Sequence, residues 1–229
     1  MCNYINTNVL PASNTDTLQN SKVDNMLFSY KMTHDTGFAP NPFHGFMTLA
    51  NCKWQIRKIK NPEKDKNLYI AGFTSKFLCG ETVGEERLIY IMKVTEKLTY
   101  KDYFTDPRFQ CKIPPRNSNN LIAKAGDNIY KPANTSSGFV QLENCNHNCG
   151  SMEDDLKGKY VLISNDFYYF GCGAIPVDNL GINIPRVQAG HDVKSANCKT
   201  LLDYLEQRNY QKNIAIHPPH TWKTNEPFN

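Results

Sequence analysis

The chain has 229 residues, of which 40% are hydrophobic, and its 26 Lys and Arg against 22 Asp and Glu give a formal net charge of +4. This length suits one large domain or two small ones, and no run approaches the roughly 20 apolar residues of a membrane helix. Nucleic-acid-binding domains usually carry a stronger basic bias, so the charge permits an anionic partner without demanding one.

The first 25 residues are mostly Asn, Ser, Thr and Asp, and they lack the charged start and apolar run of a signal peptide. We expect residues 1–25 to form a disordered or loosely packed arm, and the protein to be cytoplasmic. In that compartment cysteines are normally reduced, so free thiols are predicted at Cys2, Cys52, Cys79, Cys111, Cys145, Cys149, Cys172 and Cys198.

Alternating apolar residues predict a first strand over Met26–Met32. The stretch "HDTGFAPNPFHGF" (34–46) follows it and sets Pro40 and Pro42 among three phenylalanines. Each proline lacks an N–H donor, which excludes a helix and disfavours a central strand. We predict a rigid, ordered loop whose rings either pack on the core or form one wall of a ligand pocket.

The stretch "TLANCKWQIRKIK" (48–60) is predicted to be a short helix or an irregular cationic segment. Its cations continue to residue 66 and form either a solvated surface or a patch that faces phosphate. Strands are predicted over Asn67–Phe73 and Glu86–Leu98, joined by a glycine-containing loop typical of a hairpin.

Thr99 is a predicted N-cap for a short helix that ends before Pro107. Further strands are predicted at "FVQLE" (139–143) and "KYVLISNDFYYFG" (159–171), and a helix at "SANCKTLLDYLEQRNY" (195–210). These elements predict an α+β fold: a curved mixed β-sheet or a small PUA-like β-barrel, with short flanking helices and a C-terminal helix. Residues 26–215 are expected to form one domain and 216–229 an irregular tail.

Four punctuated segments each set an aromatic residue beside Gly, Pro, Asp or Asn: "GFAPNPF", "TDPRF", "GDNIY" and "YYFGCG". Such loops present backbone groups and a ring face together, which suits a planar ligand such as a nucleobase. They also suit turns whose rings staple loops to the core. We predict that these four segments share one pocket. A structure in which they lie on separate faces of the molecule would exclude this prediction.

Two cysteine motifs are candidates for a metal site or a catalytic thiol. The trio Cys145, His147 and Cys149 offers zinc ligands, but a structural zinc site needs four, with His191 the only suggestive fourth; no metal is predicted. Cys52 precedes Lys53, and a nearby cation lowers a thiol pKa. No histidine has a recognisable arrangement as a base, so a buried, inert Cys52 is the favoured interpretation, and no catalytic residue is predicted.

Four segments together carry a resemblance: "DTGFAPNPFHGFMTLANCKWQIRK" (35–58), "YIMKVTEKLTYKDYFTDPRFQCKIP" (90–114), "GDNIY" (126–130) and "VLISNDFYYFG" (161–171). Together they resemble the second of the nucleotide-modification-associated domain families, which belong to phage and bacterial systems that make or handle modified DNA bases. The resemblance implies a role with modified nucleotides. The PUA-like barrel, as in ASCH and EVE domains, is a fold analogy only.

Among the predicted ligand-binding residues, Phe38 and Phe43 form a stacking wall, while Asp35 and Asn41 bind polar base edges. Lys53, Arg57 and Arg108 are predicted to bind phosphate, and the opposite side of the pocket is lined by Asp127, Asn128 and Tyr130.

The leading hypothesis is a protein that binds a nucleotide or modified nucleobase, with DNA as a further partner and no membrane. One alternative is an enzyme that modifies a base or nucleotide in the same pocket, which a convergent Asp–His or Cys–His pair would favour. Another is an interaction module that engages a host factor through an exposed apolar patch. No cofactor and no oligomeric state is predicted.

Overall fold

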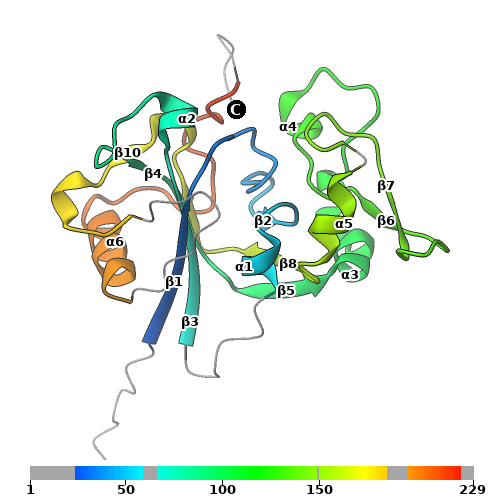
Figure 1. The fold of residues 1–229 in the computed structure, drawn as a ribbon, viewed down its shortest axis with the longest axis horizontal. Coiled ribbons are helices and arrows are strands. Elements are labelled where there is room, and N and C mark those ends of the chain that lie inside the picture. Colours follow the sequence, from blue (N-terminus) through cyan, green and yellow to red (C-terminus); the bar gives the residue numbers. More distant parts are fainter. Residues whose placement is uncertain (1–23, 59–65, 149, 185–194, 223–229) are drawn as a thin grey trace, which may run out of the picture.

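The computed structural model describes residues 24–58, 66–148, 150–184 and 195–222. Predictions for residues 1–23, for Cys149 and for His191 therefore lie outside the described residues. Two halves lie side by side in Figure 1, one built on the largest sheet and α6, the other on a smaller sheet with α3, α4 and α5.

The largest sheet has five strands in the order β1–β3–β4–β10, with β9 also paired to β4. β1 is parallel to β3, and the other pairs are antiparallel. The bounds of these strands are β1 Asp24–Lys31, β3 Lys66–Phe73, β4 Arg87–Lys93, β9 Phe167–Tyr169 and β10 Ile175–Pro176.

A second sheet has the order β2–β8–β5, and β6 pairs with β7 as a separate ribbon. The bounds are β2 Met47–Leu49, β5 Glu96–Thr99, β6 Tyr130–Pro132, β7 Phe139–Gln141 and β8 Tyr160–Ser164. The α+β class is thus confirmed. The sheets do not close into a barrel, so the PUA-like barrel is not confirmed.

The helices are short except for α6. Their bounds are α1 Trp54–Arg57, α2 Lys76–Cys79, α3 Tyr100–Thr105, α4 Leu121–Lys124, α5 Ser151–Leu156 and α6 Ser195–Gln207. Within the described residues, 3-10 helix covers Pro107–Lys112, Gly171–Gly173 and Asp178–Leu180. None of the described helices has the length and apolar character needed to cross a membrane.

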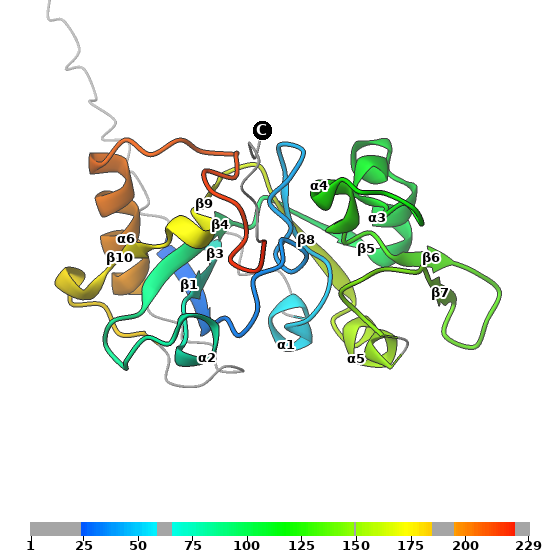
Figure 2. The same cartoon turned by 90° about the horizontal axis from the view of Figure 1, so that it is seen from above.

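Each of two predicted strands is in fact two strands that belong to different sheets. The segment predicted over Glu86–Leu98 splits into β4 and β5, and the segment 159–171 splits into β8 and β9. The split segments run side by side, since β4 pairs with β9 and β5 with β8. This pair of bent strands joins the two halves of the molecule (Figure 2).

Both faces of the large sheet are buried. One face packs against the second sheet through Phe28, Tyr30 and Leu162, and the other packs against α6 through Leu201 and Leu205. Because both faces are covered, the successive residues Leu27, Phe28 and Ser29 of β1 are all buried.

The described part of the predicted C-terminal tail has no helix or strand, but it packs closely. Residues 215–222 return to the Pro-rich loop, where the Trp222 indole N–H donates to the Thr36 carbonyl at 3.0 Å. The Trp222 ring stacks on Phe43, with 5.4 Å between the centroids. The tail thus braces the loop that follows β1.

Candidate functional site

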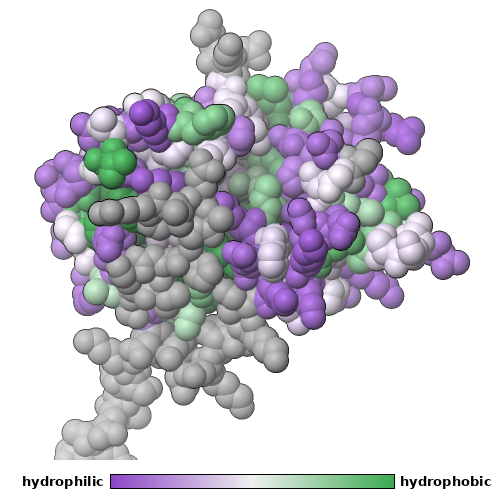
Figure 3. All heavy atoms as spheres, viewed as in Figure 1, coloured by the Kyte–Doolittle hydropathy of each residue, from purple (hydrophilic) through white to green (hydrophobic). Residues whose placement is uncertain are grey.

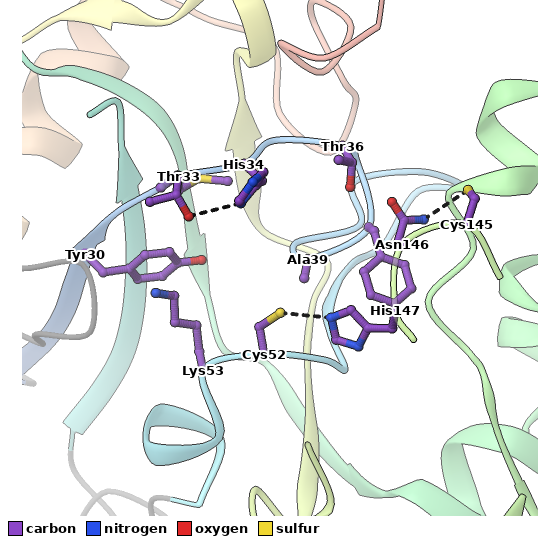
Figure 4. Close-up of a pocket in the computed structure, with 12 residues that line it drawn as sticks. Tyr30, Thr33, His34, Thr36, Ala39, Cys52, Lys53, Cys145, Asn146 and His147 are labelled. Carbon is purple, nitrogen blue, oxygen red and sulfur yellow. Dashed lines mark hydrogen bonds between the residues drawn. The ribbon is translucent and has the colours of Figure 1, made fainter. Parts of the chain in front are cut away.

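A cavity of about 340 Å³ lies where the Pro-rich loop, the turn before α1 and the loop before α5 meet (Figure 4). In the space-filling view, hydrophobic residues show in a hollow between the two halves, whose outer surface is mostly hydrophilic (Figure 3). The cavity is lined by Tyr30, Met32, Thr33, His34, Thr36, Phe38, Ala39, Cys52, Lys53, Cys145, Asn146 and His147.

A thiol and an imidazole meet on one wall of this cavity. Cys52 Sγ lies 3.3 Å from Nε2 of His147 (Figure 4). On the other side of the ring, Nδ1 of His147 lies 3.0 Å from Oδ2 of Asp155. Nδ1 makes no hydrogen bond within the described residues, so this contact is an ion pair when the ring is protonated. The order thiol, imidazole, carboxylate is that of a nucleophile, its base and an orienting acid.

The Asp155 carboxylate on α5 is buried and shared between several groups. Oδ1 accepts the backbone N–H of Cys52 at 2.6 Å, and Oδ2 accepts the Tyr130 hydroxyl at 2.7 Å. One carboxylate therefore fixes both the backbone of the thiol-bearing residue and the far side of the His147 ring.

The Arg57 guanidinium, which is fully buried at the end of α1, ties the same groups together. Its Nε donates to the Cys52 carbonyl at 2.7 Å and Nη2 donates to the Asp155 carbonyl at 2.8 Å, while Nη1 contacts the Tyr100 hydroxyl. At Gly158, a Cβ atom would lie 2.4 Å from Nη1 of Arg57. A residue without a side chain is therefore needed at position 158.

The turn that carries the thiol is conformationally unusual. Cys52 and Lys53 have φ angles of 57° and 41°, in the left-handed region that non-glycine residues rarely adopt. Such strain persists only where surrounding contacts hold it, and it concentrates at functional sites. Here the Cys52 N–H donates to Asp155 and the Cys52 carbonyl accepts from Arg57. The side chains of Cys52 and Lys53 both line the cavity.

The electrostatics of the wall favour a charged imidazole. Burial by itself would lower the pKa of His147, but the Asp155 carboxylate and the Cys52 side chain raise it to about 9. At neutral pH the ring is therefore an imidazolium beside the thiol. The neighbouring Lys53 ammonium lies 4.2 Å from the centroid of the Tyr30 ring, and desolvation lowers its pKa despite the opposing effect of Cys52.

The predicted burial of Cys52 is wrong, because the residue is exposed, and its side chain contacts His147. His147 pairs with Cys52 and Asp155, and no cluster of three or more potential metal ligands occurs in the described residues. The six cysteines that the structure describes have free thiols.

The Pro-rich loop is ordered and supplies one wall of the cavity, through Thr36, Phe38 and Ala39. The Phe38 ring meets the His147 ring edge-on, with centroids 4.8 Å apart. Asn41, by contrast, is buried away from the cavity. Its Nδ2 donates to the Ala125 carbonyl at 2.8 Å, and its Oδ1 accepts from Lys112 Nζ at 2.6 Å.

Apart from Phe38 and Lys53, the predicted ligand-binding residues do not line the cavity. Phe43 stacks on Trp222, and Arg108 is a surface residue paired with Glu96 and Asp106. Of the four aromatic segments, "GFAPNPF" alone reaches this cavity. The buried polar residues of the set instead bond within the protein; they are Asp35, Arg57, Asp127, Asn128 and Tyr130.

Several of these predicted ligand residues support the site from behind. Tyr130 bonds to Asp155, and the Asp127 carbonyl accepts the side-chain amide of Asn51, the residue before Cys52. Asp35 accepts the Tyr169 hydroxyl at 2.6 Å and lies 2.8 Å from Nδ1 of His220. Sequence reasoning therefore found Phe38 and Lys53 at the cavity and missed the pairing of Cys52 with His147.

The comparisons with known proteins give one match. The model of the family described as nucleotide modification associated domain 2 matches residues 24–226. No curated protein and no solved structure matches the chain.

Proposed function

Because the chain belongs to the nucleotide modification associated domain 2 family, we propose that it is a cysteine-dependent enzyme of nucleotide modification. It transfers or hydrolyses an acyl or amide group carried by a modified base or nucleotide. The observation that carries the proposal is the contact of Cys52 Sγ with Nε2 of His147, whose ring pairs with Asp155.

In the first step Cys52 reacts as the thiolate of a thiolate–imidazolium pair, with its proton already on His147 Nε2, and the sulfur attacks the carbonyl carbon of the substrate. A C–S bond forms while the carbonyl electron pair moves to oxygen. When the carbonyl re-forms, the bond to the leaving nitrogen or oxygen breaks, and that atom takes the proton from Nε2. The product is a thioester on Cys52.

In the second step water or an acceptor amine gives a proton to His147 Nε2 and attacks the thioester carbon. The C–S bond then breaks and the sulfur leaves as thiolate. Asp155 stays ionised and stabilises the imidazolium, in the orienting role that a carboxylate has in such triads. The rings of Phe38 and Tyr30 give the cavity apolar walls for a planar base, and its volume lies in the range of small-ligand sites.

The test is turnover by wild-type protein of a panel of nucleosides, nucleotides and oligonucleotides that carry N-acyl or amide-linked groups on the base. Products and any covalent adduct are identified by mass spectrometry. Cys52→Ala should lower turnover by at least about a hundredfold, since a nucleophile and its base act as a unit. Cys172→Ala is the matched control, because Cys172 is exposed but lies outside the cavity lining.

Turnover that survives in Cys52→Ala would overturn the proposal. The leading sequence-based hypothesis, a binding protein without catalysis, would be supported by a different result. In that case nucleotides raise the melting temperature of wild type and Cys52→Ala equally, and neither protein forms product or adduct.

A further inference from the structure

We propose that Lys53 forms an anion subsite beside Cys52, so that the substrate group which meets the thiol carries a carboxylate or a phosphate. This inference rests on the proposed function and specifies the class of its substrate. It concerns the wall of the cavity formed by Tyr30, Cys52 and Lys53 (Figure 4).

The backbone places thiol and ammonium next to each other. Cys52 and Lys53 are consecutive residues with left-handed backbone conformations, and both side chains reach the cavity. In Figure 4 the Lys53 side chain extends along the Tyr30 ring, on the side of Cys52 away from His147. An electrophilic carbon at Sγ therefore has an imidazolium on one side and an ammonium on the other.

Among the residues that the structure describes, no acidic side chain lines the cavity. Asp35 belongs to the loop that forms one wall, but its carboxylate is turned toward Tyr169 and His220. Asp155 lies behind the His147 ring. The ionisable groups at the lining are those of Tyr30, His34, Cys52, Lys53, Cys145 and His147, so the charge offered to a ligand at neutral pH is mainly positive.

The Lys53 ammonium is placed where an anion would gain most. It lies against the face of the Tyr30 ring, and desolvation lowers its pKa. The Tyr30 hydroxyl is hydrogen-bonded to the Tyr90 hydroxyl at 2.8 Å. A carboxylate or phosphate in the cavity would meet this ammonium, and charge pairs are stronger in such partly dry surroundings than in water.

The test needs no knowledge of the substrate. Iodoacetate and iodoacetamide both alkylate a thiolate: the sulfur attacks the CH2 carbon, a C–S bond forms, and iodide leaves with the electron pair of the C–I bond. The two reagents differ in charge, because iodoacetate carries a carboxylate. The ratio of their rates at one cysteine therefore cancels the thiolate fraction and reports the affinity of the site for an anion.

Rates are measured by peptide mass spectrometry at Cys52 and, as an internal reference, at the exposed Cys111. In wild type the ratio of iodoacetate to iodoacetamide should be at least about fivefold higher at Cys52 than at Cys111, and this preference should shrink as salt is added. Lys53→Met should bring the ratio at Cys52 close to that at Cys111, and Lys53→Arg should retain the preference.

Lys58→Met is the matched control, since it removes a nearby cation that does not reach the cavity. The Lys58 side chain lies over the Trp54 ring, outside the cavity lining. It should leave the ratio unchanged. Equal ratios at Cys52 and Cys111 in wild type would overturn the proposal, and so would an equal loss in Lys58→Met and Lys53→Met. If Lys53→Met does not fold, His147→Asn decides the matter, because the preference at Cys52 should persist without the imidazolium if Lys53 carries it and should vanish if it does not.

Protection separates the two sources of the anion. If the natural group is a phosphate, a nucleoside 5′-monophosphate should slow alkylation of Cys52 by iodoacetamide in wild type more than glutarate does; the reverse order assigns a carboxylate. Failure of the proposed function gives a different result from failure of the anion subsite. If the proposed function is wrong, Cys52 should react with neutral iodoacetamide no faster than Cys111 does.

Discussion

Cys52 and His147 are 95 residues apart in sequence, yet Sγ and Nε2 are 3.3 Å apart. The thiol stands on the turn before α1, and the imidazole on the loop before α5. These short helices contact each other, and the hydrogen bonds of Arg57 and Asp155 join them. The reactive pair therefore depends on the packing of α1 against α5.

His147 should activate Cys52 toward neutral electrophiles. Replacing it by Asn removes the imidazolium that stabilises a thiolate on Cys52, so alkylation of Cys52 by iodoacetamide at pH 7 should slow by about tenfold or more. Peptide mass spectrometry follows the rate, and Cys111 in the same molecule is the control. An unchanged rate at Cys52 would show that the contact has no chemical consequence.

The pH dependence of stability should carry a signature of His147. Its pKa in the folded protein is about 9, above the ordinary value of 6.5. A raised pKa contributes stability that is complete below about pH 6.5 and is lost as pH rises through about 9. The difference in free energy of unfolding between wild type and His147→Gln should therefore be largest at pH 6 and shrink by pH 10. Urea unfolding at both pH values measures it; a constant difference would contradict the pairing with Asp155.

Arg57 should be a stability residue. Its guanidinium is fully buried and bonded to Cys52, Tyr100 and Asp155. Arg57→Leu strands the Asp155 carboxylate, and breaking a buried ion pair in this way costs about 3–5 kcal/mol. The control is Arg108→Gln, which breaks a surface pair and should cost no more than about 1 kcal/mol. Chemical denaturation compares the two, and similar small losses would rule out the role given to Arg57.

Asn41→Ala separates a structural role from a ligand contact. A pocket-facing amide would lose ligand affinity while the melting temperature stays within a few degrees, as the sequence suggested. In the structure Asn41 is buried and accepts from the Lys112 ammonium, so its loss leaves a buried charge short of an acceptor and should cost about 1–3 kcal/mol. Thermal unfolding measures this, with the exposed Asn117→Ala as a control expected within about 0.5 kcal/mol.

The charge on Lys112 should make the free energy of unfolding depend on pH. Burial lowers the pKa of Lys112 to about 8, although Asp127 opposes the shift. A lysine pKa below its ordinary value means that the folded state gives up its proton first, so the buried ammonium weakens the fold more at low pH than at high pH. In wild type the free energy of unfolding should rise between about pH 7 and pH 10, and Lys112→Met should make this rise smaller. Urea unfolding of each protein across this pH range measures it. A dependence identical to wild type would refute this.

Local sequence patterns determined much of the secondary structure. Alternation located β1, the glycine-containing loop indicated the antiparallel β3–β4 pair, and Thr99 caps α3 by accepting the N–H of Asp102. The spacing of apolar residues located α6, which ends near Gln207. These features depend on neighbours within a few residues, so the sequence alone predicts them.

The point at which each long apolar segment passes from one sheet to the other depends on residues that are distant in sequence. β4 ends and β5 begins around Val94, whose N–H bonds to the Leu68 carbonyl, while Thr95 bonds to the Ile163 carbonyl. The partner strand, not the propensity of the residues, therefore fixes where one sheet gives way to the other. An apolar run records burial, but it does not record which sheet buries it.

The sequence by itself supplied a thiol next to a cation, and a histidine in a polar loop, as separate features. Only the tertiary structure brought them together, with Asp155 behind the imidazole and Arg57 behind the turn. A catalytic arrangement consists of distances between side chains, and those distances depend on the packing of segments that no local pattern relates. Phe38 and Lys53 were found because a ring in a rigid loop and a cation beside a thiol are local signals, whereas the partner of Cys52 was not.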